Sequence, residues 1–361
     1  MIQMRKLTKG QLRLWSYRRR RVLRRMAQRP PALELAVSGT RPPLVARPYP
    51  ASSPLRSALR IELPAVMSLR RNREQTLAVY QAIRRATRKR RPLRLDFTTL
   101  RETTPAASLV LASEIDRWRR IQNIRPVVID EDRWDPVIFR LFNDLGLFDL
   151  VKVQNPPTLT GLPEHTERYI RYRTGLRALG DEAVALRQAV EVVIGEELLG
   201  KSAMYRGVTE AMTNVHKHAY IAAYRDHTPI LRDTWWIGGG FDVKQRRLRV
   251  LVFDQGVGIP VTLPRRYSME RVGDIIRGRG WKNGHAGRIA AAMELGKTRT
   301  GKQNQGRGLP DLLRFVNVRD RGSLRILSLR GEYLYVAGKQ EQLVDHPTPL
   351  GGTLIQWEID L

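Results

Sequence analysis

The chain contains no cysteine among its 361 residues. It therefore has no disulfide framework, no cysteine-ligated zinc or iron–sulfur site and no thiol nucleophile, which fits a reducing compartment. The sequence also lacks an uninterrupted apolar run of about 18 residues, so no membrane-spanning helix is predicted. The first residues lack the apolar core of a secretory signal. From these absences we expect a cytoplasmic protein without a transmembrane segment.

Acidic residues are scarce, with 35 Asp and Glu against 64 Lys and Arg, and the formal net charge is +29. The excess is uneven, because residues 1–60 hold 15 basic residues and a single acid, Glu34. A basic arm of this kind suits phosphate backbones, anionic lipid or an acidic protein. Arginine-rich composition also produces solvated arms that bind nothing. Nucleic-acid contact through residues 1–30 therefore stays open beside a solvated arm.

Changes in composition divide the chain into four segments. A length of 361 residues permits two domains that each bury their own core, and a hydrophobic content of 42% excludes a chain that is disordered as a whole. Proline-rich stretches indicate linkers. The expected segments are a basic arm and Pro-rich linker (1–55), an α/β domain (56–155), a linker (156–175) and a second α/β domain (176–361).

Hydrophobic periodicity predicts alternating strands and helices in the first domain. The expected strands are 59–63, 93–97 and 126–129, and the expected helices are 72–89, 106–121 and 135–145. In the second domain the pattern predicts helices at 181–199, 202–220 and 309–316 and strands at 235–243, 248–253, 324–328, 332–337 and 353–359. A long segment rich in Gly, Arg and Lys, 261–305, separates the early strands from the last helix.

The first candidate motif lies on the helix expected over 202–220. Glu210, Asn214 and His218 are four residues apart and share one helix face. An asparagine oxygen can hold Mg²⁺, and a neighbouring carboxylate can orient or deprotonate a hydroxyl or a water. Without other motifs, the same spacing describes a solvated helix face.

The second motif, Asp254 to Pro260, follows an apolar strand. An aspartate at a strand end can accept a hydrogen bond from an exocyclic amine such as that of adenine, and Gly256 and Gly258 let the backbone approach a ligand. Two further glycine segments follow, Gln305–Leu309 before a helix and Gly351–Thr353 before the last strand. A helix start favours phosphate, although each glycine segment alone also fits an ordinary turn.

Together these four segments resemble the GHKL superfamily of gyrases, heat-shock chaperones, histidine kinases and mismatch-repair ATPases. Glu210–His218 matches the N-box of that superfamily, Asp254–Ile259 its first Gly box, Gly306–Leu309 its second, and Gly352-Thr353 its terminal pair. The amino-acid sequence around the N-box is similar to that of the anti-sigma-factor serine kinases. The resemblance implies a two-layer α/β sandwich, the Bergerat-type ATP-binding fold, over 176–361.

The resemblance also implies roles for the polar residues. Asn214 would hold the Mg²⁺ that bridges the ATP phosphates, and Glu210 would be the catalytic carboxylate. Asp254 would bind the adenine amine with help from Thr353, and His218 belongs to the same nucleotide-binding set.

The glycine-rich segments would complete that site. Gly256 and Gly258 would shape its floor, while Gly306, Arg307 and Gly308 would line the phosphates. The segment 261–305 would be the ATP lid. Its candidates for contact with the γ-phosphate are Lys297, Arg299 and Lys302, although a plain loop would have the same composition.

The first α/β domain resembles, more weakly, the STAS domains of anti-sigma-factor antagonists. The resemblance rests on the strand 93–97, which ends near an acid, and on the helix start Thr103–Ser108. In that family a Ser or Thr at this helix start accepts a phosphoryl group, but the usual Ser-Gly pair is missing here. A generic βαβα domain stays open as the alternative.

We therefore expect a regulatory protein that binds Mg²⁺ and ATP and acts with a protein partner, by protein phosphorylation or by ATP-dependent conformational switching. One alternative is a nucleic-acid-associated ATPase that uses residues 1–30, and another is a module that binds ATP without turnover. A histidine kinase would need a phosphoacceptor on paired helices, and His165 lies beside Pro163 instead. No metal site other than that for Mg²⁺ is predicted, and a homodimer is left open.

Overall fold

The computed structural model describes residues 58–152, 167–176, 180–221, 231–297, 309 and 311–361. These residues belong to one compact unit. The arm and Pro-rich linker expected over 1–55 lie outside the described residues, as do residues 156–166 of the second expected linker.

The first part of the unit is a small parallel α/β layer. Its three-stranded sheet has the order β1-β3-β5, from strands Leu59–Glu62, Leu93–Asp96 and Val127–Ile129. Helices α2 (Arg73–Arg88), α3 (Pro105–Gln122) and α4 (Pro136–Leu145) alternate with these strands. A short parallel pair, β2 (Val66–Met67) with β4 (Glu102–Thr103), was not predicted. The alternation of strands and helices expected from periodicity is confirmed.

Capping residues fix the helix ends in this layer. Thr104 accepts a hydrogen bond from the Ala107 amide at the start of α3, and Pro105 fills the first helical position. Gly146 ends α4 in the left-handed conformation, which glycine adopts without strain. No helix in the described part of the chain is both long and apolar enough to span a membrane.

The second part is a seven-stranded antiparallel sheet with the order β11-β10-β9-β12-β8-β7-β6. Its strands are β6 (Glu167–Gly175), β7 (Trp235–Asp242), β8 (Arg247–Asp254), β9 (Ser323–Ser328), β10 (Gly331–Val336), β11 (Gln342–Asp345) and β12 (Thr353–Asp360).

The edge strand β6 corrects the expected linker over 156–175. Residues 167–175 pair with β7, and Ile170 is the one fully buried residue of this strand. An edge strand needs little apolar surface, so it lacks the alternation that marks a buried strand. The other edge strand, β11, is exposed and was missed for the same reason.

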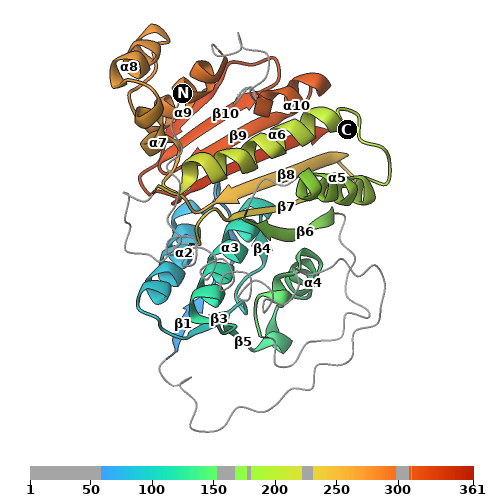
Figure 1. Ribbon diagram of the computed structural model, residues 1–361. Helices are drawn as coiled ribbons and strands as arrows, with labels where there is room; N and C mark the ends of the chain where they lie inside the picture. The colour runs from blue at the N-terminus through green and yellow to red at the C-terminus, as the bar shows by residue number, and fades with distance from the viewer. Residues whose placement is uncertain (1–57, 153–166, 177–179, 222–230, 298–308, 310) are drawn as a thin grey trace, which may run out of the picture. The chain divides into compact units, whose positions relative to one another are not determined.

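Helices α5 (Gly180–Ile194), α6 (Lys201–Asn214), α9 (His285–Lys297) and α10 (Asp311–Arg319) cover one face of this sheet (Figure 1). Two more helices, α7 (Ile259–Arg266) and α8 (Met269–Gly278), form a small separate core with α9. Residues 259–297, which include most of the predicted lid segment, are therefore largely helical.

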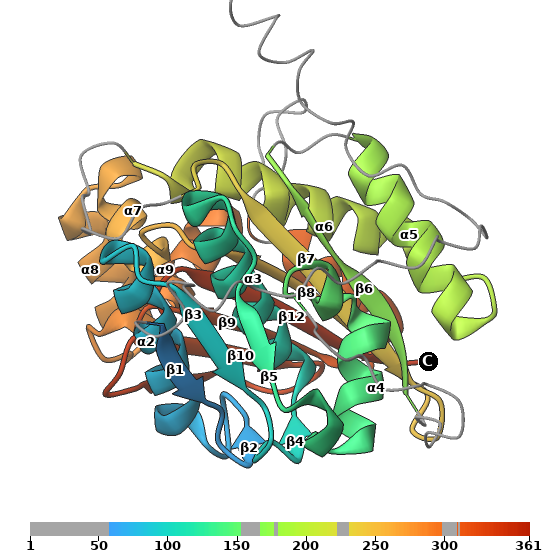
Figure 2. The same cartoon turned by 90° about the horizontal axis from the view of Figure 1, so that it is seen from below.

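The other face of the large sheet packs against the small parallel layer (Figure 2). Alternate residues of β8 divide between two cores: Val250 and Val252 face α6 and its neighbours, whereas Leu251 and Phe253 face α2 and α3. The two expected α/β regions thus share one hydrophobic core, and helices cover both faces of the seven-stranded sheet.

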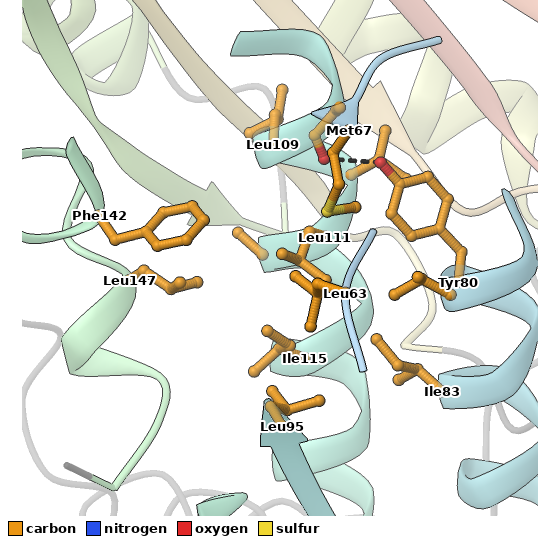
Figure 3. Packing of buried hydrophobic residues seen from close by; sticks show 14 of the residues in the cluster. Leu63, Met67, Tyr80, Ile83, Leu95, Leu109, Leu111, Ile115, Phe142 and Leu147 are labelled. Atoms are coloured by element: carbon orange, nitrogen blue, oxygen red, sulfur yellow. Dashed lines mark hydrogen bonds between the residues drawn. The ribbon is translucent and has the colours of Figure 1, made fainter. Parts of the chain in front are cut away.

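Helix α3 is the centre of that shared core. Residues 106–118 are buried on every side of the helix, which packs against α2 as well as the strands β7 and β8. The Tyr80 hydroxyl of α2 donates to the Ala107 carbonyl of α3 at 2.7 Å, and Figure 3 shows this hydroxyl pointing toward α3. Leu63 and Met67 lie in the same cluster beside Leu109 and Leu111.

Candidate nucleotide-binding site

The N-box residues lie at the C-terminal end of α6. Glu210 and Asn214 are half-buried in the last turns of the helix, and the chain continues as a π-helical turn, Val215–Ala219, that includes His218. Single π-helical turns are common at functional sites because they redirect side chains. The predicted helix over 202–220 therefore exists, with its last turn widened.

Burial changes the ionisation of two N-box groups. Burial raises the pKa of Glu210, and Asp311 adds to this effect, although Asn214, Lys217 and Arg266 oppose it. The pKa of His218 is lowered by burial and by the positive charges of Arg266 and Lys217. A carboxyl group with a raised pKa is a stronger base when ionised, and the histidine is mainly neutral near pH 7.

Asp254 ends β8 with its side chain buried. Burial raises its pKa to about 7, although the amides of Gly256 and Thr353 stabilise the carboxylate in part. The Gly256 amide donates to its Oδ1 atom at 2.8 Å. This buried acid can accept a hydrogen bond from a ligand amine where water has little access.

Ala219, which directly follows the predicted N-box, touches the predicted first Gly box through the backbone. The Val257 amide donates to the Ala219 carbonyl at 2.8 Å. A Cβ atom on residue 256 would lie 2.3 Å from the same carbonyl oxygen, so only glycine fits there. Gly258 precedes α7 and begins the turn into it.

Thr353 begins β12 directly opposite Asp254 in the antiparallel register. Its hydroxyl is 3.0 Å from that of Ser328, which also accepts a hydrogen bond from the Ile259 amide at 2.9 Å. Ser328 was not predicted as a site residue. The one sequence feature that could have indicated a role for Ser328 was its position at the end of a predicted strand.

Tyr220 also links the motifs, although the sequence assigned it no role. Its hydroxyl donates to the Thr234 carbonyl at 2.6 Å and accepts from the Gln255 amide at 3.1 Å. The Gln255 side chain in turn donates to Ser113 of α3 at 3.3 Å. The first Gly box is therefore held from both faces of the sheet.

Other predicted contacts fall outside the described residues. Gly306, Arg307 and Gly308 of the second Gly box are among them, as are Arg299 and Lys302 and the side chain of Lys297. In the described part of the chain, the basic side chains whose charges act on both Glu210 and His218 are Lys217 and Arg266. Both are exposed and were missed, because runs of basic residues occur throughout this sequence.

The residues present fit a magnesium ion held mainly by phosphate. Among the described residues no group of three or more His, Asp or Glu side chains could enclose a metal ion. Mg²⁺ in nucleotide sites commonly takes one or two protein oxygens together with phosphate and water, so such a group is not required. The Asn214 side chain interacts with Glu210, whose pKa it lowers, and its amide oxygen is the atom that could ligate Mg²⁺.

The helix start Thr103–Ser108, on which the STAS resemblance rests, is buried at Ser108 and half-buried at Thr103 and Thr104. Ser108 is buried, with its hydroxyl 2.9 Å from that of Thr103, and Thr104 caps α3. A kinase could not reach Ser108 without displacing α3 from the core.

No model of a known protein family matches this sequence, and no curated protein matches it significantly.

Proposed function

We propose that this chain is a GHKL-type regulatory protein that binds ATP with Mg²⁺. The observation that carries the proposal is the meeting of three motifs at one end of the large sheet. Ala219 bonds to Val257, and Thr353 pairs with Asp254, although these residues are up to about 130 positions apart in the sequence. If the motifs matched only by chance, their segments would have no reason to lie next to one another in the fold.

The architecture supports the same proposal. We assign the large sheet with α5, α6 and α10 to a Bergerat-type two-layer sandwich, whose second face is covered by α2–α4. We assign the parallel layer, residues 58–152, to a STAS-like domain. Ser108 of this layer is buried, which favours a phosphoryl acceptor other than Ser108, such as a partner protein.

Each site residue has a chemical role in this proposal. Asp254 accepts a hydrogen bond from the adenine amine, and Asn214 offers its amide oxygen to Mg²⁺, which neutralises phosphate charge when bound. Glu210 orients and deprotonates the attacking hydroxyl, helped by its raised pKa. Lys217 and Arg266 attract the polyphosphate.

Calorimetric titration with ATP and Mg²⁺ tests binding. We expect the double variant Asp254→Asn with Asn214→Ala to bind ATP at least about 100-fold more weakly than the wild type. The matched control, Asp132→Asn with Asn143→Ala, makes the same chemical changes in the small parallel layer and should leave affinity unchanged. Equal affinity of the site variant and the wild type would refute the proposal.

Incubation with γ-labelled ATP, with and without cell lysate, distinguishes the outcomes of binding. Free labelled phosphate indicates hydrolysis, and a labelled protein indicates phosphoryl transfer. We expect Glu210→Ala to lower either rate at least about 100-fold while ATP still binds. An unchanged rate would remove Glu210 from the chemistry.

A further inference from the structure

The loop that precedes β12 is attached to α2 at several points. The guanidinium of Arg73, in the first turn of α2, donates to the Thr348 carbonyl at 3.2 Å. Glu74 accepts a hydrogen bond from the Thr348 hydroxyl. Leu350 is buried in the core that α2 and α3 share with the sheet.

Arg84 holds the same loop at the turn itself. Its Nη2 atom reaches the Gly351 carbonyl at 3.5 Å. A Cβ atom on residue 351 would lie 2.4 Å from Arg84 Nη1, so the guanidinium rests directly on the backbone of this turn. The turn leads into Thr353, opposite Asp254.

Arg84 is fixed in turn by α3. Its Nε and Nη2 atoms donate to Glu114 Oε1 at 3.0 and 2.7 Å. Glu114 is fully buried, and its other oxygen accepts from Arg117. A buried, doubly paired carboxylate holds its partners in one geometry.

The neighbouring residue on α3 serves the other turn. Ser113 accepts the hydrogen bond from Gln255, which lies between Asp254 and Gly256. Consecutive residues of one buried helix are therefore connected to both turns that flank Asp254. Ser113 acts on the first Gly box, and Glu114 acts through Arg84 on the Gly351–Thr353 turn.

We propose that Arg84, Ser113 and Glu114 are positioning residues that set the spacing of these two turns, and with it the selectivity of the site for a purine with a 6-amino group. The inference rests on the proposed function. Selectivity follows because a hydrogen bond to an exocyclic amine requires its acceptor to be placed within a few tenths of an ångström. None of the three residues needs to touch the ligand.

The test compares ATP with inosine triphosphate, which has a carbonyl oxygen in place of the 6-amino group. The double variant Arg84→Met with Glu114→Gln removes the Arg84–Glu114 ion pair, while the amide oxygen introduced at position 114 can still accept a hydrogen bond from the buried Arg117. We expect its ATP-to-ITP affinity ratio, measured by calorimetry on the full chain, to fall on the order of tenfold. General destabilisation lowers both affinities by the same factor and leaves the ratio unchanged.

Milder variants keep the proposal testable if the double variant does not fold. Arg84→Lys retains the charge but loses the fork that spans Glu114 and Gly351, and Ser113→Ala removes the acceptor of Gln255. Each should lower the ratio by about two- to fivefold. The matched control Arg71→Met breaks an exposed pair with Glu102 in the same layer and should leave the ratio unchanged.

The outcomes separate this inference from the proposed function. If the wild type binds ATP selectively and the Arg84 and Ser113 variants keep the wild-type ratio, the positioning role is refuted and ATP binding stands. If the wild type binds neither nucleotide, both proposals are refuted. A lowered ratio in the Arg84 and Ser113 variants, with the Arg71 control unchanged, supports the inference.

Discussion

The two faces of the seven-stranded sheet are covered in chemically different ways. On the face of α6 and α10, the Trp357 indole donates to a main-chain carbonyl, that of Leu312, at 2.8 Å. On the face of α3, the Trp236 indole donates to the Asp116 carboxylate at 3.1 Å. Asp116 also pairs with Arg119 and Arg120.

This difference separates two tasks. The α6 face carries Glu210 and Asn214, the residues that we propose act on the ligand. The α3 face carries buried charge pairs, which add little net stability, and we propose that they fix geometry instead. In the two proposals above, the α3 layer would therefore position the turns, and the α6 layer would supply the residues that contact the ligand.

The largest expected effect comes from two adjacent tryptophans of β7. Trp235 and Trp236 are both fully buried and belong to opposite faces. Replacing either by alanine should lower the free energy of unfolding by about 3–5 kcal/mol in urea denaturation. Because the faces share one sheet, each variant should unfold in one transition seen equally by circular dichroism and fluorescence. Two separate transitions, with one variant shifting just one of them, would show that the faces are independent.

A somewhat smaller loss is expected at Gly352, where the Gly-Thr turn crosses the end of β8. Its φ is +103°, and a Cβ atom would lie 2.0 Å from the Asp254 carbonyl oxygen. Gly352→Ala should lower the free energy of unfolding by about 3 kcal/mol. Gly338→Ala is the control, because Gly338 also has a positive φ but a Cβ atom added there would have no other atom within 4 Å. Gly338→Ala should lower the free energy of unfolding by about 1 kcal/mol. Equal losses in the two variants would contradict the close approach of residue 352 to the Asp254 carbonyl oxygen.

The pH dependence of stability should report the burial of Asp254. Its pKa is about 7 in the folded protein against 3.8 when unperturbed, so between these values the folded state holds a proton that the unfolded state has lost. Stability from this group therefore falls as pH rises, by about 2 kcal/mol between pH 5 and 7. Subtracting the unfolding free energies of Asp254→Asn from those of the wild type isolates this change. A difference that stays flat with pH would show that Asp254 titrates normally.

The smallest effect is expected for ion pairs at the outer surface of the parallel layer. Arg71 pairs with Glu102, and both side chains are about half exposed. Arg71→Ala should change the free energy of unfolding by less than about 1 kcal/mol, and added salt should reduce that change further. A larger loss of unfolding free energy would show that this exposed pair stabilises the fold as much as the buried ion pairs of α3 do.

The sequence predicted the elements with strong periodicity. Helix α2 and strands β8 and β12 begin and end within about two residues of expectation. The apolar positions of α2 repeat at the period of one buried helix face, whereas β8 and β12 are short apolar runs buried on both faces. The motif residues Glu210, Asn214, Asp254 and Thr353 lie at or near the ends of such elements, where the patterns stop.

Long-range contacts were not predictable from the same patterns. Glu114 and Asp116 occupy polar positions on a helix, and their partners Arg84 and Trp236 lie 30 and 120 residues away. Nothing local distinguishes such a buried charge from a solvated one. The strand β6 was missed because its exposed edge suits Arg and Tyr as well as apolar residues.

The strand order has a consequence for how the chain folds during synthesis. β12 lies between β8 and β9 in the sheet, yet it follows both of them in the sequence. Until β12 is synthesised, no strand joins the β6–β8 group to the β9–β11 group, and α3 lacks part of the apolar surface against which it packs. Because β12 is synthesised after the other strands, most of the chain leaves the ribosome before its central strand is in place. Contacts between such distant positions also form slowly. Nascent chains should depend on chaperones during that interval.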